Sequence, residues 1–132
     1  MSQPAILLPG ALTWTLVLDG AEMAILDGDP AKPAEFYLIR FRTNRDIHVP
    51  LHWHPLDEHL TVITGPFEIA FAPAPGDFRA VEPGGHVSVP AGLHHTARYG
   101  AGTVVEVSGI GPFEMVMVDR MTDPAYRGHS AD

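Results

Sequence analysis

The residues with the clearest capacity for chemistry lie in one stretch, from His48 to Gly65, which holds four of the chain's eight histidines. His52 and His54 are separated by one residue, and Glu58 follows four residues after His54. Successive side chains of a strand point to opposite faces, so these two imidazoles share a face, about 7 Å apart. Two imidazoles with a carboxylate just beyond them are three candidate ligands for one metal ion. The alternative is that each imidazole only bonds water or backbone.

Composition limits both the class of protein and the kind of metal site. The chain has 132 residues, the length of one domain, and its 16 acidic and 8 basic residues give a net charge of −8. Such an acidic chain has no electrostatic means of holding a phosphate backbone, which argues against a nucleic-acid partner. Cysteine is absent, so any metal must take nitrogen and oxygen ligands. The N-terminus lacks a basic leader and no run is apolar enough to span a membrane, so we expect a cytoplasmic protein without a membrane partner.

The elements that must position these residues are predicted to be short strands. Glycine and proline occur 13 times each and are spread along the chain, which favours strands joined by turns over a helical bundle. We expect about ten or eleven strands, little or no helix, and a single all-β domain, best explained as a double-stranded β-helix or jelly-roll barrel. An arm (residues 1–12) and a polar tail (residues 122–132) should flank it. The predicted strands are 14–19, 22–27, 35–42, 52–54, 59–64, 67–72, 78–81, 86–89, 95–99, 103–108 and 113–119.

A second pattern, downstream of the first, combines glycine, proline and one more histidine. Together the two patterns resemble the motifs of the cupin superfamily, G-x5-H-x-H-x3-4-E-x6-G and G-x5-P-x-G-x2-H-x3-N. With their 18-residue spacer they cover about a third of the chain. The matching residues are His52, His54, Glu58 and Gly65 in the first motif and Gly84, Pro90, Gly92 and His95 in the second.

The resemblance implies that His52, His54, Glu58 and His95 bind one divalent transition metal inside the barrel. Three imidazoles and a carboxylate suit Fe, Mn, Ni, Co, Cu or Zn and leave one or two positions for water or substrate, whereas Ca and Mg favour oxygen shells. The chain departs from the motifs where Asp46 replaces the opening glycine and Tyr99 replaces the closing asparagine. Neither position is a ligand in the family, so the departures affect a turn and the pocket wall.

Three residues are candidates for a catalytic role. Glu58 either stays on the metal or swings away as a base. Tyr99 lies four residues after His95 in the same predicted strand, so the two side chains share a face. Tyr99 therefore either offers a hydroxyl to the pocket or simply packs. Glu106 is a carboxylate in an apolar strand: facing inward it would be a general base with a raised pKa, and facing outward it would be solvated.

Each of the other charged and imidazole groups near the motifs has two possible roles. Arg40 and Arg42 either pair with an anionic substrate or are solvated. His48 could line the mouth of the pocket, although exposure is the default for its loop. His59 is next to Glu58 and His94 is next to His95, so each should point to the opposite face from its neighbour. We therefore expect both to face outward. Core candidates are Trp14, Phe36, Leu38, Leu60, Val62, Phe67, Ile69, Val87 and Val105.

These features favour a metal-dependent enzyme that acts on a small organic molecule. Dioxygenase, isomerase and lyase chemistry all remain open, because a fold does not determine a reaction. The alternative is a non-catalytic protein that binds or senses a small molecule, with a structural metal enclosed by four protein ligands. Small cupins are commonly dimers, and exposed edge strands favour pairing, so a homodimer is expected.

Overall fold

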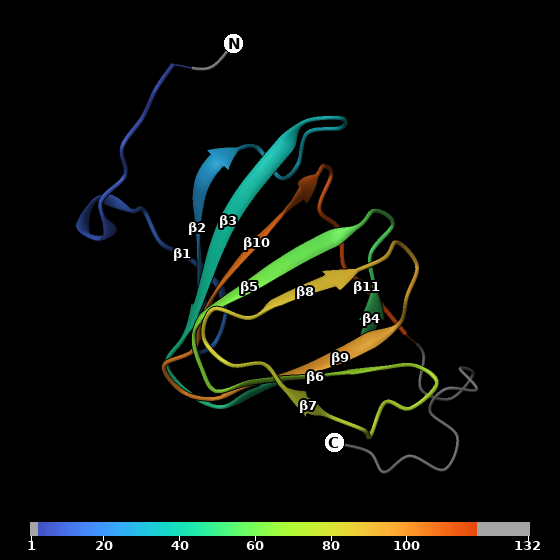
Figure 1. The fold of residues 1–132 in the computed structure, drawn as a ribbon. Coiled ribbons are helices and arrows are strands. Elements are labelled where there is room, and N and C mark those ends of the chain that lie inside the picture. Colours follow the sequence, from blue (N-terminus) through green and yellow to red (C-terminus); the bar gives the residue numbers. More distant parts are fainter. Residues whose placement is uncertain (1–2, 119–132) are drawn as a thin grey trace.

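The computed structural model describes residues 3–118, which form two antiparallel sheets (Figure 1). The large sheet has the strand order β1-β2-β3-β10-β5-β8, and the small sheet has the order β11-β4-β9-β6-β7. The predicted all-β jelly roll is therefore confirmed. The elements are η1 (Pro9–Ala11, a 3₁₀ turn), β1 (Thr15–Leu18), β2 (Ala21–Gly28), β3 (Phe36–Thr43), β4 (Ile47–Trp53), β5 (Glu58–Thr64), β6 (Phe67–Phe71), β7 (Arg79–Ala80), β8 (His86–Val89), β9 (His95–Tyr99), β10 (Val104–Ile110) and β11 (Val116–Met117).

The core lies between the two sheets, where the inward side chains of the long strands meet. Each strand contributes alternate residues, as a pleated strand must, and each fully buried aliphatic or aromatic side chain stabilises the fold by about 1.5–3 kcal/mol. The buried cluster comprises Tyr37, Ile39, Leu60, Val62, Phe67, Ile69, Val89, Ala97, Val105 and Val107.

Strand β3 turns the opposite face inward from the one predicted. Phe36 was a core candidate, but it is 49% exposed, whereas Tyr37 and Ile39 are buried. The reason is that Phe36 shares its face with Arg40 and Arg42, whose guanidinium groups form ion pairs with glutamates of neighbouring strands. A charged group is rarely buried, so the two arginines determine which face of the strand meets solvent.

Strand β4 is longer than predicted and contains a proline. It runs from Ile47, and its pairing with β9 is interrupted by a bulge between Val49 and His52. Pro50 lies within this bulge, where the missing N–H breaks no ladder hydrogen bond. Beyond the bulge, His52 pairs directly with His95. The irregularity thus sets the register that brings the two motifs side by side.

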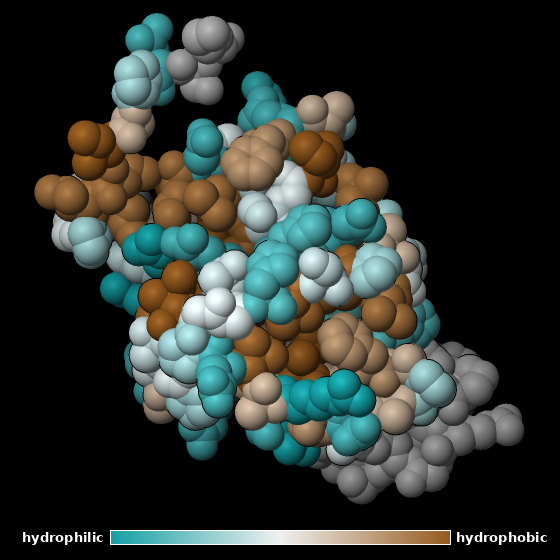
Figure 2. All heavy atoms as spheres, viewed as in Figure 1, coloured by the Kyte–Doolittle hydropathy of each residue, from teal (hydrophilic) through white to brown (hydrophobic). Residues whose placement is uncertain are grey.

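The ends of the chain are less enclosed than the barrel. Residues 3–14 form an arm that leads away from the barrel (Figure 1). The arm carries apolar side chains (Figure 2). The predicted tail, residues 122–132, and the end of the last predicted strand at Asp119 lie outside the described residues. Between residues 3 and 118 there is no helix of the length and apolarity needed to cross a membrane.

Candidate metal centre

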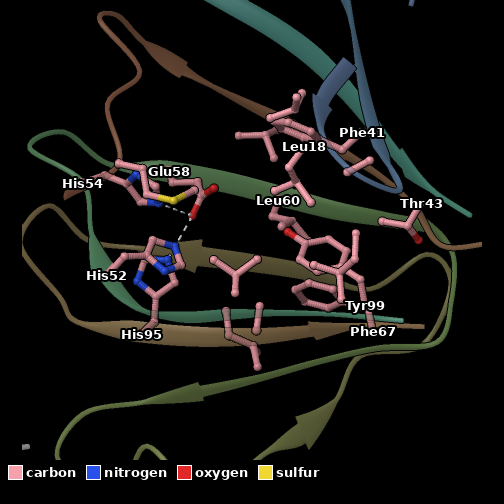
Figure 3. Close-up of a pocket in the computed structure, with 18 of the residues that line it drawn as sticks. Leu18, Phe41, Thr43, His52, His54, Glu58, Leu60, Phe67, His95 and Tyr99 are labelled. Carbon is pink, nitrogen blue, oxygen red and sulfur yellow. Dashed lines mark ion pairs between the residues drawn. The ribbon is translucent and has the colours of Figure 1, made fainter. Parts of the chain in front are cut away.

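Three histidines from two neighbouring strands converge at one end of the barrel. His52 lies in β4, His54 follows that strand directly, and His95 begins β9. Each imidazole offers one nitrogen to a group whose members all lie within 4.8 Å of one another, and all three residues are buried. Figure 3 shows the three rings turned toward a common space. Three buried imidazoles at this spacing can hold one metal ion.

A backbone carbonyl orients each of these rings. The Nδ1 atoms of His52, His54 and His95 lie 2.7, 2.7 and 2.9 Å from the carbonyl oxygens of Pro50, Glu114 and Leu93. A carbonyl oxygen only accepts, so each Nδ1 must carry the hydrogen and donate it. In the neutral ring, Nε2 then keeps its lone pair, which is the state that a metal ligand requires.

Glu58 completes the cluster from the start of β5. Its Oε1 lies 3.2 Å from Nε2 of His54 and 3.5 Å from Nε2 of His95, and its side chain is almost fully buried. The Nε2 of His54 is itself buried and makes no hydrogen bond of acceptable geometry. A lone pair that faces a carboxylate at this distance is repulsive unless a proton or a metal ion lies between them. This donor set therefore fits a divalent transition metal.

The electrostatics of the cluster favour an anionic carboxylate beside neutral and cationic rings. Burial and, to a smaller extent, neighbouring His95 together lower the pKa of His52 to about 4. Burial also opposes charge on His54, but the adjacent Glu58 outweighs it and raises the pKa of His54. Burial opposes ionisation of Glu58, yet interactions with His54 and His95 hold the pKa of this carboxyl well below its usual range. The Glu58 carboxylate therefore carries a negative charge where a cation would bind.

Hydrogen bonds hold the loop after β4, which contains His54, against the loop that precedes His95 in β9. Asp57 Oδ1 accepts the Ala91 N–H at 2.8 Å, and the Gly92 N–H donates to the His54 carbonyl at 2.9 Å. Gly92 has a φ of +80°, a conformation that favours glycine. Gly92 therefore allows the turn that brings the segment before His95 against the segment that contains His54.

A cavity of about 90 Å³ opens directly onto the histidines and Glu58. Its walls are mostly apolar, and Tyr99 and Thr43 lie toward the end opposite the histidines (Figure 3). Burial raises the pKa of the Tyr99 hydroxyl, and the charge of Glu58 adds to the effect, so the hydroxyl stays protonated. The remaining lining residues include Leu18, Phe41, Leu60, Phe67, Ile69, Ala97 and Val107.

Two residues of the cavity wall were missed in the sequence. Phe113 stacks on His54 with the ring centroids 5.0 Å apart, and Met115 also lines the cavity. In the sequence, the only indication of these two residues is that they belong to the mostly apolar segment after Pro112. That segment has no spacing relation to either motif, so its position beside the histidines depends on the tertiary fold.

Glu106 does not reach the cavity. It lies on β10 between the buried residues Val105 and Val107, so its side chain faces outward, and it forms an ion pair of 2.6 Å with Arg40. Of the two alternatives for Glu106, the structure shows the outward one. Arg42 faces outward as well and pairs with Glu22 at 2.9 Å.

The other histidines also lie away from the three convergent rings. His48 bonds Thr96 Oγ1 at 2.9 Å and lines a surface groove outside the cavity. His59 is exposed and stacks on His86, with ring centroids 5.6 Å apart, as its outward parity predicted. His94 stacks on Trp53, with ring centroids 6.3 Å apart. The structure thus separates three convergent histidines from four peripheral ones within residues 3–118.

Comparison with known proteins identifies the fold. No protein-family model and no curated protein matches the sequence. Among solved structures, the polyketide cyclase RemF from Streptomyces resistomycificus matches with a TM-score of 0.73 and 18% identity, over 95% of this chain and 97% of that one. An RmlC-like cupin from Shewanella frigidimarina NCIMB 400 matches with a TM-score of 0.66 and 14% identity, over 80% and 89% of the two chains. This chain is a cupin-fold protein.

A third similar structure is the DMSP lyase DddQ from Ruegeria pomeroyi DSS-3, with a TM-score of 0.66 and 21% identity over 83% of this chain and 62% of that one. Within the cupin fold, the two departures from the motifs have local explanations. Asp46 replaces the opening glycine and accepts the Ala101 N–H at 3.0 Å, which holds the turn before β4. Tyr99 replaces the closing asparagine and contributes to the cavity wall.

Proposed function

We propose that this cupin-fold protein is a metal-dependent enzyme that acts on a small, largely apolar organic molecule carrying an oxygen donor. The observation that supports the proposal is the contact between the apolar cavity and the cluster of His52, His54, His95 and Glu58. A ligand in this cavity would have its polar end at the metal and its apolar part against the walls. The similar structures named as a polyketide cyclase and a lyase support an enzymatic role.

The residues of the site have distinct tasks in this proposal. His52, His54 and His95 hold the metal through Nε2, and Glu58 adds a carboxylate oxygen. When bound, the metal supplies a Lewis acid that polarises an oxygen of the substrate. Glu58, whose pKa is lowered, is ionised near neutral pH and can accept a proton at Oε1 if it leaves the metal. Tyr99, whose pKa is raised, donates a hydrogen bond to a second polar group of the substrate.

The deep burial of the cluster supports a second candidate function. All four residues are between 2% and 7% exposed, so four protein groups could enclose the metal completely. A closed four-ligand site is typical of a structural metal. In that case the protein would bind or sense a small molecule in the cavity without transforming it.

Metal content tests the site itself. Protein purified without added metal should contain about one transition-metal ion per chain by elemental analysis, as one cluster of four donors predicts. The His52→Ala/His54→Ala variant should lose nearly all of it. His59→Ala removes an exposed histidine outside the cluster and should keep the metal. Equal metal content in the double variant and the wild type would refute the proposed site.

Turnover separates the two candidate functions. Metal-loaded protein would be incubated with 1,3-diketones, flavonols and hydroxy acids while oxygen uptake and product formation are followed. An enzyme should consume at least one member of such a panel, and the loss of turnover in Glu58→Gln should exceed any loss of binding. Ligands that bind the metal-loaded protein and are recovered unchanged would support the binding or sensing role instead.

A further inference from the structure

Three of the chain's five methionines lie close together, at Met115, Met117 and Met121. Met121 lies outside the described residues. Met115 directly precedes strand β11, and Met117 ends that strand. Their spacing of two residues places both side chains on the same face of the segment. Neither methionine belongs to the cluster of three histidines and Glu58.

The register of β11 places these two methionines opposite the histidine pair. Strand β11 is antiparallel to β4, and Met117 is the direct partner of His52. Two residues earlier in the same register, Met115 falls opposite His54, whose Nδ1 bonds the adjacent Glu114 carbonyl at 2.7 Å. Residues directly opposite in an antiparallel pair share a face, with Cβ atoms about 4.5–5.5 Å apart. A Met-x-Met pattern therefore faces the His-x-His pattern across two neighbouring strands.

Met115 reaches the cavity that the histidines share. It lines this cavity together with His54 and Glu58, which Figure 3 shows turned toward it. The Nε2 of His54 is a buried nitrogen without a hydrogen bond of acceptable geometry. A methionine side chain is unbranched and has three rotatable bonds, so its sulfur can adjust to an ion held by the imidazoles.

The exposure of the two methionines does not fit a role in packing alone. Met115 is 47% exposed and Met117 is 49% exposed. Methionine is among the residue types most often buried, and in a core it fills gaps between apolar side chains. Met23, in contrast, is partly buried and packs against the hydrophobic core. Half-exposed methionines beside a cluster of histidines are accessible to an incoming metal ion.

A thioether discriminates among metals, because it is a soft and uncharged ligand. Imidazole and carboxylate groups suit several transition metals, whereas thioether sulfur favours copper(I). The charge of the cavity agrees with this preference. Glu58 is the only acidic residue among the described residues that line the cavity, and its carboxylate balances the single positive charge of copper(I). A divalent ion there would leave one charge unbalanced between largely apolar walls, which is costly.

We propose that Met115 and Met117 complete a copper(I) site, in which their thioether sulfurs bind the ion together with the Nε2 atoms of His52 and His54. Glu58 balances the charge of the ion. This inference rests on the proposed metal centre of the histidine cluster, and it adds the identity of the metal and two sulfur ligands from β11 and the residue before it.

Copper(I) affinity tests the proposal first. Competition with the chromophoric chelator bicinchoninate, without oxygen and with ascorbate as the reductant, gives the Kd of copper(I). The Met115→Leu/Met117→Leu variant keeps side chains of similar volume but loses both thioethers. Its affinity for copper(I) should fall at least about tenfold, whereas its affinity for Zn(II) should stay within about twofold of the wild type. The matched control, Met23→Leu, alters a methionine of the core and should change neither affinity. Urea unfolding would confirm that both variants are folded.

X-ray absorption at the copper edge identifies the ligand atoms. The chain has no cysteine, so in a sulfur-free buffer any copper–sulfur contact must come from methionine. The wild type loaded with one equivalent of copper(I) should show both sulfur and nitrogen ligands. Met115→Leu/Met117→Leu should show nitrogen and oxygen ligands without sulfur.

The possible failures separate this proposal from the metal centre on which it rests. Copper(I) without sulfur ligands in the wild type, or unchanged copper(I) affinity in Met115→Leu/Met117→Leu, would overturn the role of the methionines and leave the histidine centre intact. Sulfur ligation that persists with wild-type copper(I) affinity in His52→Ala/His54→Ala would overturn the shared site. Unchanged affinity of that variant for both ions would refute the histidine centre, and the copper(I) site with it.

Discussion

At the scale of single residues, the contact between His54 and Glu58 needs a positive charge. The Nδ1–H of His54 is committed to the Glu114 carbonyl, which leaves a lone pair 3.2 Å from the Glu58 carboxylate. In the metal-free protein a proton on Nε2 can supply the charge, in keeping with the raised pKa of His54. If a metal ion is bound by the cluster, the ion would supply the charge instead, and protons and metal ions would compete for the same place.

Glu58→Gln should weaken metal binding. The substitution keeps the shape of the side chain but removes the charge that attracts the cation, so we predict a loss in affinity of at least about tenfold. Competition with a chromophoric chelator would measure it. Glu82→Gln, at an exposed position away from the cluster, should leave the affinity unchanged. An unchanged affinity in Glu58→Gln would mean that the carboxylate stays off the metal.

Tyr99→Phe should affect ligands and not the metal. The ring packs edge-on against Phe67, with ring centroids 5.1 Å apart, and the substitution keeps that contact. Loss of one hydrogen bond to a bound ligand should cost about 0.5–1.5 kcal/mol, which raises its Kd by about two- to tenfold. Calorimetry with a ligand found by screening would show the change. Identical Kd values would assign Tyr99 to packing alone.

His52 should make the metal-free protein sensitive to acid. Its folded pKa of about 4 lies below the ordinary 6.5, so the unfolded chain binds a proton first as pH falls. The free energy of unfolding should therefore decrease from pH 6.5 toward pH 4. His54 has the opposite sign, because its raised pKa stabilises the fold below pH 6.5 and the contribution is lost as pH rises through the folded value.

Urea unfolding in the presence of a chelator would isolate the effect of His52. The wild type should lose stability between pH 6.5 and pH 4 faster than His52→Asn does, because the variant lacks the imidazole that titrates only when unfolded. Parallel pH profiles for the two proteins would contradict the assignment of the acid sensitivity to His52.

At the scale of elements, turns determine where the strands begin and end, and glycine serves them in two different ways. Gly28 and Gly84 both have positive φ, at +71° and +89°. A Cβ at Gly28 would collide with the carbonyl oxygen of Phe36, whereas a Cβ at Gly84 would meet nothing within 4 Å. Gly28 is required because the backbone of Phe36 approaches it closely. Gly84 is required only because of its positive φ.

The two glycines should therefore respond differently to alanine. Gly84→Ala should cost about 1–2 kcal/mol, the penalty for an L-residue in a left-handed conformation. Gly28→Ala adds a backbone clash where β2 pairs with β3, so its free energy of unfolding should fall further. Urea unfolding of both variants would compare them. Equal losses would show that the β2–β3 ladder shifts to accept the methyl group.

The predictability of an element depended on whether its two faces differ in polarity. Strand β5 alternates sharply, and its Leu60 and Val62 are buried as expected. Strand β10 reads VVEVS, with apolar residues on both faces, so the sequence does not determine the direction of Glu106, whereas the pairing with β3 does. In β3 the large apolar side chain of Phe36 suggests that its face is buried, but Arg40 and Arg42 on the same face keep that face toward solvent.

At the scale of the whole molecule, the metal should act as a clamp between sequence-distant parts of the barrel. The three histidines and Glu58 lie in or next to β4, β5 and β9, which meet only in the folded chain, so metal binding would favour the folded state. At a free metal concentration of 100 times Kd, this stabilises the fold by about 2.7 kcal/mol. Removal of the metal with EDTA should therefore lower Tm.

Calorimetry can show whether this shift comes from the proposed site. The EDTA-induced fall in Tm should be reversed by added metal in the wild type and should be absent in His52→Ala/His54→Ala. A fall of the same size in the double variant would place the stabilising ion elsewhere.

The sequence alone determined which residue types were available and how they were spaced. His52, His54, Glu58 and His95 stand at the cupin spacings, the strand pattern indicates a jelly roll, and the lack of cysteine limits the donors to nitrogen and oxygen. These features are local, because side-chain alternation and turn formation depend on neighbouring residues. They sufficed for the fold and for the candidate ligands.

Only the tertiary structure decided how these residues are oriented and what surrounds them. The hydrogen bond from His54 to Glu114 spans sixty residues, and Phe113 reaches the same ring from the same distant segment. Whether Tyr99 lines a cavity or Glu106 faces solvent depends on which side of a strand meets the opposite sheet. Such contacts depend on how whole strands pack against each other. A shift of one residue in the register of a strand would move each of its side chains to the opposite face of the sheet.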